Sequence, residues 1–211
     1  MDEGRHILIC GDVGVGKSTL IRRLLEYSRR PLYGFVTKRS AVPDRDGLFS
    51  VRIRPAAQSG DEWDSGPKNL VGATDRARCF RYPEVFDGLG ADLLRAPARG
   101  LILMDELGFL ESGAERFCSG VLRTLDGDIP VLAAMKSRDT DFLRAVRDHP
   151  NGALFRITKE NRDALFPLLL PRILRWNGEL TRRTTGPEGA GAGPMYRAFP
   201  TAGGSPPERD V

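Results

Sequence analysis

Residues 6–20 of the chain read HILICGDVGVGKSTL. The aliphatic run at 7–9 predicts a buried strand, and the apolar residues at 20, 21, 24 and 25 recur with the spacing of a helix. The segment between this strand and this helix matches the pattern G-x-x-x-x-G-K-S/T, with Gly11, Gly16, Lys17 and Ser18 at the fixed positions. A strand before this pattern and a helix after it form the setting of a phosphate-binding loop, so the stretch predicts a P-loop.

A P-loop predicts a polyphosphate ligand. Glycines adopt positive φ without strain, and the extra Gly14 lets successive backbone N–H groups face one anion at a helix start. We expect Lys17 to reach the β and γ phosphates and Ser18 to coordinate Mg²⁺. The predicted nucleotide-binding residues of the loop are Gly11, Asp12, Val13, Gly14, Val15, Gly16, Lys17, Ser18 and Thr19.

Two carboxylates follow another apolar run. Residues 100–104 read GLILM and are followed by Asp105 and Glu106. At the carboxyl edge of a parallel sheet, Asp105 would hold the Mg²⁺ opposite Ser18. Glu106 would orient, or take a proton from, the water that attacks the γ-phosphate. The predicted catalytic pair is therefore Glu106 and Lys17, with Ser18 and Asp105 as metal ligands.

The length of 211 residues suits one globular domain with a substantial core. From residue 178 onward the composition shifts to Gly, Pro, Ser, Thr and Ala, which cannot build a core. We therefore predict a P-loop NTPase domain at residues 1–177 and a flexible Gly/Pro-rich tail at residues 178–211.

Composition also restricts the class of protein. The longest apolar runs fall short of a membrane span and the N-terminus lacks a secretion-signal pattern, which predicts a cytoplasmic protein without a membrane partner. The sequence pI of about 9.2 raises nucleic acid as a partner, but the modest net charge of +4 does not support one, and a protein partner stays unknown. Three widely spaced cysteines, Cys10, Cys79 and Cys118, suit reduced core thiols.

Aliphatic segments alternate with amphipathic ones, which predicts an α/β fold of the P-loop NTPase type: a three-layer sandwich around a mostly parallel sheet. Strands are expected at 6–10, 33–38, 48–54, 101–105, 130–135 and 153–157. The turn Arg45–Asp46–Gly47 favours a hairpin region near residues 32–81 over a helical crossover. Helices are expected at 18–29, 83–95, 113–125, 140–148 and 160–175.

Two helices carry further signals. Ser112 and Glu115 form a capping-box pattern that predicts the start of the 113–125 helix. Pro167 and Pro171 lie inside the 160–175 segment and predict a kink or two short helices, because proline removes a backbone hydrogen bond.

The chain resembles the small P-loop nucleoside-triphosphatases over about residues 5–166. The resemblance lies in the P-loop, in GFVTK at 34–38, in DELGFLE at 105–111 and in NRD at 161–163. It implies Mg²⁺-dependent hydrolysis of ATP, GTP and other nucleoside triphosphates to diphosphates, with loose base selectivity. The chain departs from the family pattern at Lys38–Arg39, at Gly47–Leu48–Phe49, at Met135–Lys136 and in the tail.

Alternative functions remain open at this point. A guanine-specific switch is disfavoured because Asn161 stands where the base-reading motif needs a carboxylate. A nucleotide or small-molecule kinase is an enzymatic alternative, since Glu106 could activate a substrate hydroxyl. A slow nucleotide-gated accessory protein is the alternative outside enzymes. Arg162 is predicted to contact nucleotide. Lys136 and Arg138 could supply charge to the transition state, but a surface loop explains them adequately.

Overall fold

The computed structural model describes residues 4–58, 67–75 and 77–184. Within them a single sheet has the strand order β5-β4-β3-β2-β6-β7-β1-β8. The strands that run parallel to one another are β2 (Leu32–Arg39), β6 (Leu101–Leu107), β7 (Val131–Met135), β1 (His6–Cys10) and β8 (Gly152–Arg156). Because they share a direction, their carboxyl ends meet at one edge, where ligands of such sheets bind.

An antiparallel extension continues the sheet beyond β2. It comprises β3 (Phe49–Pro55), β4 (Leu70–Thr74) and β5 (Cys79–Arg81). The β2–β3 hairpin turns through Arg45–Asp46–Gly47, where Asp44 accepts hydrogen bonds of 2.9 Å from the backbone N–H groups of Asp46 and Leu48. The predicted hairpin region is confirmed, although the short strands β4 and β5 were not among the predicted strands.

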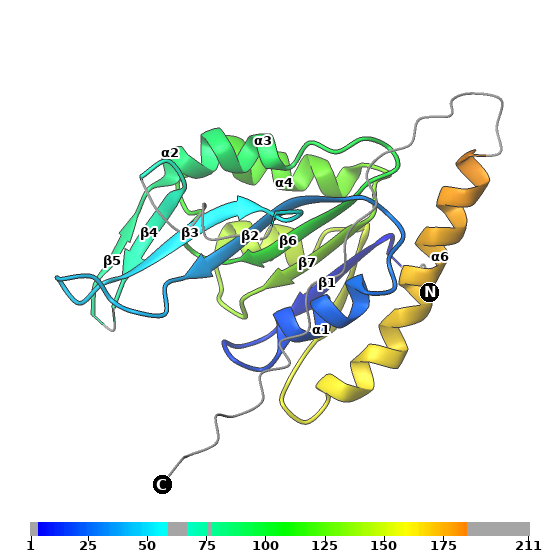
Figure 1. Ribbon diagram of the computed structural model, residues 1–211, viewed down its shortest axis with the longest axis horizontal. Helices are drawn as coiled ribbons and strands as arrows, with labels where there is room; N and C mark the ends of the chain where they lie inside the picture. The colour runs from blue at the N-terminus through cyan, green and yellow to red at the C-terminus, as the bar shows by residue number, and fades with distance from the viewer. Residues whose placement is uncertain (1–3, 59–66, 76, 185–211) are drawn as a thin grey trace, which may run out of the picture.

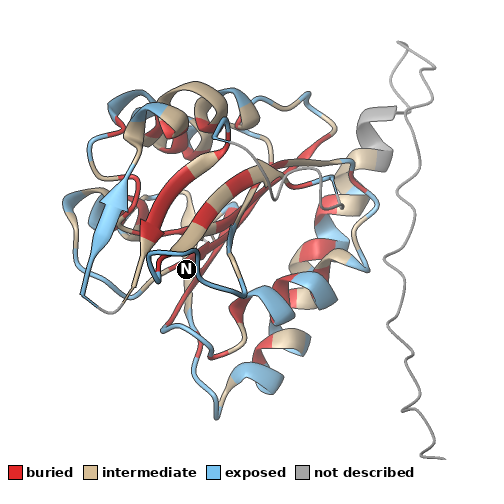
Figure 2. Cartoon of the chain, turned by 60° about the vertical axis from the view of Figure 1, so that its left-hand side comes forward, coloured by how far each residue is buried: buried red, intermediate tan, exposed pale blue. Residues whose placement is uncertain are grey.

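Helices cover both faces of the sheet (Figure 1). One layer holds α2 (Pro83–Val85), the π-helical turn η2 (Phe86–Gly90), α3 (Ala91–Leu93), α4 (Glu115–Asp126) and α5 (Asp141–Arg147). The other holds α1 (Lys17–Leu25) and α6 (Arg162–Thr184). Each layer has its own apolar cluster against the sheet, and the central strands are buried (Figure 2). The predicted three-layer α/β fold is confirmed.

The predicted capping box of the 113–125 helix is wrong. Helix α4 begins at Glu115 after Ala114, and no side chain caps it from the preceding residue. Instead the carboxylate of Asp87, in the π-helical turn, accepts a hydrogen bond of 2.9 Å from the backbone N–H of Phe117. A carboxylate distant in sequence therefore satisfies an N–H group of the first turn, which is the task of a cap.

Helix α6 is continuous from Arg162 to Thr184, so of the predicted kink or two short helices the second is wrong and the kink stays a prediction. Pro167 and Pro171 are both exposed and are four residues apart, which places them on the same, outer face of the helix. The carbonyl groups that the prolines leave without partners can therefore bond to water. The helix also extends seven residues past the predicted boundary at 177/178, while residues 185–211 lie outside the described residues.

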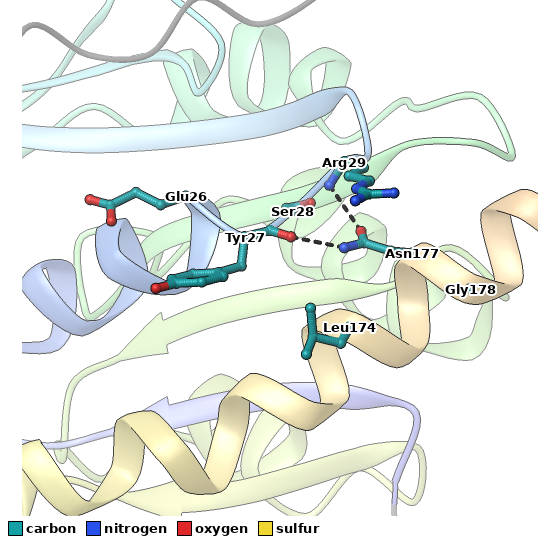
Figure 3. A pocket seen from close by; sticks show the side chains of 7 residues that line it. All are labelled: Glu26, Tyr27, Ser28, Arg29, Leu174, Asn177 and Gly178. Atoms are coloured by element: carbon teal, nitrogen blue, oxygen red, sulfur yellow. Dashed lines mark hydrogen bonds between the residues drawn. The ribbon is translucent and has the colours of Figure 1, made fainter.

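The far end of α6 is anchored to the segment after α1 (Figure 3). Asn177 donates a hydrogen bond of 2.8 Å to the carbonyl of Tyr27 and accepts one of 2.9 Å from the backbone N–H of Arg29. A cavity of about 470 Å³ lies between these segments. Because α1 runs away from the P-loop, this cavity lies at the opposite edge of the sheet from the loop.

The structure bears on two expectations from composition, which concern the cysteines and the absence of a membrane span. Cys79, on the edge strand β5, is exposed, so the prediction of a core thiol is wrong for this residue. All three residues of β5 are exposed, so no other described part of the chain buries the side chains on either face of this strand. Among the described residues, no helix has both the length and the apolar composition needed to cross a bilayer.

Candidate active site

The P-loop joins the end of β1 to the start of α1. Gly14 and Gly16 have φ of 80° and 108°, a region that side chains rarely adopt, and Gly16 directly precedes the helix. A Cβ atom at Gly11 would lie 2.5 Å from the carbonyl oxygen of Ile157, beyond β8. Glycine is thus needed at Gly11 for close packing and at the other two positions for backbone conformation.

The remaining predicted loop residues have different environments. Val15 is buried in the core cluster beneath the loop, whereas Val13 is 80% exposed at its tip. Asp12 accepts a hydrogen bond from the hydroxyl of Ser137, which follows β7. Thr19 is exposed on α1. The side chains of the predicted loop residues therefore do not all face the interior of the loop: those of Val13 and Thr19 are exposed, and that of Val15 is in the core.

Lys17 is buried and its ammonium group lies at the centre of the loop. Its Nζ atom donates hydrogen bonds of 2.7 Å and 2.8 Å to the carbonyl oxygens of Gly11 and Asp12. The same atom lies 3.1 Å from Oε2 of Glu106, at the end of β6. The two residues that were predicted to be catalytic are 89 positions apart in the sequence, yet they form a direct ion pair.

The predicted metal ligands also meet. The hydroxyl of Ser18 donates a hydrogen bond of 3.1 Å to Oδ1 of Asp105. Burial raises the pKa of the Asp105 carboxyl to about 6, because removal from water disfavours its charged form, while the hydrogen bond from Ser18 acts in the opposite direction. A cation bound between these oxygens would restore the ionised form.

Thr37, near the end of β2, fixes the backbone of the carboxylate pair. Its hydroxyl accepts a hydrogen bond of 3.1 Å from the backbone N–H of Glu106 and lies 3.4 Å from the Glu106 carbonyl oxygen. The sequence signal for this residue was the GFVTK segment of the family resemblance. The structure places Thr37 beside β6 as a support for the backbone at Glu106.

Lys136 is a site residue for which the sequence interpretation preferred a surface loop. Its Nζ atom lies 3.3 Å from Oε1 of Glu106, so the carboxylate bridges Lys17 and Lys136. The available signal was its position directly after β7, at the edge where the P-loop and Asp105 also lie. The interpretation of Lys136 as a surface-loop residue is wrong, because the chain passes next to Glu106.

Arg162 lies over the P-loop. A Cβ atom at Gly16 would be 3.4 Å from Cδ of Arg162, and the guanidinium is half exposed near Asp163. Its neighbour Asn161 instead builds the preceding turn: its side chain accepts a hydrogen bond from the backbone N–H of Thr158 and donates one to the carbonyl of Arg156. Arg162 is therefore available to a ligand on the loop, whereas the amide of Asn161 is already engaged.

The buried side chain of Glu111 holds the backbone of the segment after Glu106 by hydrogen bonds. Both of its carboxylate oxygens lie 3.1 Å from the backbone nitrogen of Gly108, and the side chain is almost fully buried. Burial raises its pKa to about 7, against the opposing effects of these hydrogen bonds and of the nearby Lys136 ammonium. The loop that follows β6 is therefore fixed from within the protein.

A phosphate-binding loop beside an acidic strand end, on a three-layer parallel sheet, defines a P-loop nucleotide-binding protein. The sequence profile of the NTPase family matches residues 6–170, and the chain belongs to this family. The resemblance stated from the motifs is confirmed.

Similar proteins include the nucleoside-triphosphatase THEP1 of Thermofilum pendens, which is 34% identical over 178 residues covering 80% of this chain and 95% of that protein. The human cancer-related nucleoside-triphosphatase is 28% identical over 193 residues covering 77% and 93%. The crystal structure of THEP1 from Aquifex aeolicus has a TM-score of 0.62 at 24% identity, covering 80% of this chain and 98% of that one. This structural likeness shows the shared fold.

Proposed function

We propose that this protein is an enzyme that hydrolyses nucleoside triphosphates, ATP and GTP among them, to diphosphates and phosphate with Mg²⁺ as cofactor. The observation that carries the proposal is the ion pair of 3.1 Å between Lys17 and Glu106. It supports the proposal because an ammonium suited to phosphate binding and a carboxylate suited to act as a base lie in direct contact. Family membership and the names of the relatives support the same reaction class.

Binding rests on the loop and on Lys17. The loop N–H groups and the N-terminus of α1 attract the phosphates, and the Lys17 ammonium supplies a fixed positive charge. The half-exposed guanidinium of Arg162, next to Gly16, adds a second cation on the outer side of the loop. The exposed loop tip at Val13 contributes backbone rather than side-chain contacts.

The residues present fit Mg²⁺. Ser18 and Asp105 offer a hydroxyl and a carboxylate oxygen within 3.1 Å of each other, and Mg²⁺ binds through few protein oxygens together with phosphates and water. When bound, the ion would neutralise the charge that develops on the β and γ phosphates.

Glu106 carries the proton-transfer step. Its side chain is 23% exposed, so one of its oxygens can reach a water molecule at the site. A triphosphate that binds Lys17 competes with Oε2 of Glu106 for the same ammonium, which leaves that oxygen as an acceptor. Glu106 then takes a proton from the attacking water as the bond to the γ-phosphorus forms and the bond to the bridging oxygen breaks.

The deciding experiment uses the purified chain with Mg²⁺ and a panel of nucleoside triphosphates. Released phosphate and phosphorylated acceptors are measured in the same reactions, with and without cell extract. Phosphate release by the protein alone is expected for ATP, GTP and others. Transfer to an acceptor faster than to water would replace hydrolysis by a kinase activity, and turnover only with extract would indicate the accessory protein.

The division into an NTPase domain at 1–177 with a tail, and location in the cytoplasm, stay predictions. For the tail, the support is its Gly/Pro-rich composition alone.

A further inference from the structure

The carboxylate of Glu106 is held by two cations that come from different parts of the sheet. Oε2 lies 3.1 Å from Nζ of Lys17 in the P-loop, and Oε1 lies 3.3 Å from Nζ of Lys136 after β7. We propose that Lys136 is a positioning residue that holds Glu106 toward the attacking water during triphosphate hydrolysis. This inference rests on the proposed function and adds a residue to it.

Lys136 is itself held firmly. Its backbone N–H donates a hydrogen bond of 3.0 Å to the carbonyl of Leu107, next to Glu106. Its side chain extends along Gly108, where an added Cβ would be 3.3 Å from Cδ and 3.6 Å from Nζ. The ammonium lies 5.2 Å from the centre of the Phe109 ring, a distance at which the ring attracts a cation. The side chain therefore has a defined direction toward Glu106.

The two lysines have different tasks because they have different other partners. Lys17 also donates to the carbonyls of Gly11 and Asp12 inside the loop, so it belongs to the phosphate site. When a triphosphate engages Lys17, the ion pair with Glu106 weakens. Lys136 then remains as the cation on the carboxylate and limits its rotation. The buried carboxylate of Glu111 lies near enough to interact with the charge of this cation.

Glu106 acts on a triphosphate that is already bound, so a change in its position affects the rate of the chemical step more than the affinity for triphosphate. Loss of Lys136 should therefore lower kcat and leave KM almost unchanged. The loss should be smaller than that from removal of the base itself, because Glu106 keeps its charge and its backbone support from Thr37. About tenfold to hundredfold is expected, below the range of a full general base.

The test compares steady-state kinetics of Lys136→Met, Lys136→Arg and the original protein. Lys136→Met keeps the length of the stem but removes the charge, and it should lower kcat with KM within about twofold. Lys136→Arg should recover most of the rate. Lys136→Gln gives a second neutral variant, and the thermal unfolding midpoint verifies folding. Arg138→Met is the matched control, because Arg138 lies over the same Phe109 ring at 4.5 Å.

A double-mutant cycle decides how Lys136 acts. If it acts through Glu106, Lys136→Met should not slow the reaction further in a Glu106→Gln background. Multiplying losses would mean that Lys136 touches the phosphates directly, and would overturn the proposal. So would an unchanged kcat in Lys136→Met and Lys136→Gln while the original protein hydrolyses triphosphate. Absence of hydrolysis by the original protein would instead refute the proposed function, and the inference with it.

Discussion

The hydroxyl of Ser18 donates a hydrogen bond of 3.1 Å to the carboxylate of Asp105, and so connects the first turn of α1 to the end of β6. The two residues are 87 positions apart, yet their oxygens form one side of the candidate site. Their chemistry predicts that metal binding and nucleotide binding can be separated by substitution.

Asp105→Asn should weaken Mg²⁺ binding more than binding of metal-free nucleotide, because the amide keeps the shape but loses the charge that holds a hard cation. A loss of about tenfold or more in apparent Mg²⁺ affinity is expected. Calorimetric titrations of nucleotide with and without Mg²⁺ measure both quantities, and Asp92→Asn on the distant α3 serves as control. Equal losses in the two titrations would place Asp105 outside the metal shell.

Lys17→Ala should abolish turnover and weaken triphosphate binding, because its ammonium is the buried positive charge of the loop. The loss of affinity should be larger for triphosphate than for monophosphate, since the β and γ phosphates are absent from the latter. Fluorescence titration with labelled nucleotides measures the difference. Unchanged hydrolysis would contradict the assignment of the loop.

Glu106→Gln should separate binding from chemistry. The amide retains size and hydrogen-bonding capacity but is not a base, so the hydrolytic step should slow by about 10²–10⁴. Nucleotide and Mg²⁺ should still bind, and intact triphosphate should remain on the protein. Single-turnover reactions followed by separation of the bound nucleotides show this directly. A variant as fast as the original protein would mean that another group orients the water.

The C-terminal part of the chain should divide functionally at the end of α6. A chain that ends at residue 184 should keep its unfolding midpoint and its rate, because the Gly/Pro-rich remainder offers little apolar surface. A chain that ends at residue 176 should unfold at lower temperature, since it loses the two hydrogen bonds of Asn177 to the segment after α1. Calorimetry of both chains tests this, and equal midpoints would show that Asn177 is dispensable.

His6 should make stability depend on pH. Its Nδ1 accepts a hydrogen bond from the backbone N–H of Val131, so Nε2 carries the proton and donates to the carbonyl of Leu125 at 2.9 Å. Burial lowers the pKa of His6 from 6.5 to about 4. The neutral ring therefore contributes stability above pH 6.5 that is lost as the pH falls toward 4, on the order of 3 kcal/mol in total.

Urea unfolding of the original protein and of His6→Asn at pH 7.5 and pH 5 measures this effect. The amide side chain can donate and accept hydrogen bonds but does not titrate in this range. The stability difference between the two proteins should shrink by about 2 kcal/mol at the lower pH. A constant difference would contradict a histidine held neutral by burial.

The candidate site was predictable from sequence where neighbours in the chain are also neighbours in space. The P-loop is a motif of consecutive residues and is therefore recognisable in the sequence. The position of Asp105 after an apolar run likewise indicates the end of a strand. Lys136 was assigned to a surface loop because its role depends on the pairing of β7 with β6, and the residues next to it in the sequence do not indicate that pairing. The capping of α4 by Asp87 was missed for the same reason.

The sequence by itself determined the strands of the parallel part of the sheet, the hairpin region, the phosphate loop and the acidic strand end, because hydrophobic periodicity and glycine placement act over a few residues. It did not determine the short strands β4 and β5. Only the tertiary structure decided that Glu106 lies between Lys17 and Lys136, that Cys79 is exposed, and that α6 continues past its prolines. Each depends on packing between segments far apart in the chain, where burial and long-range pairing override local preference.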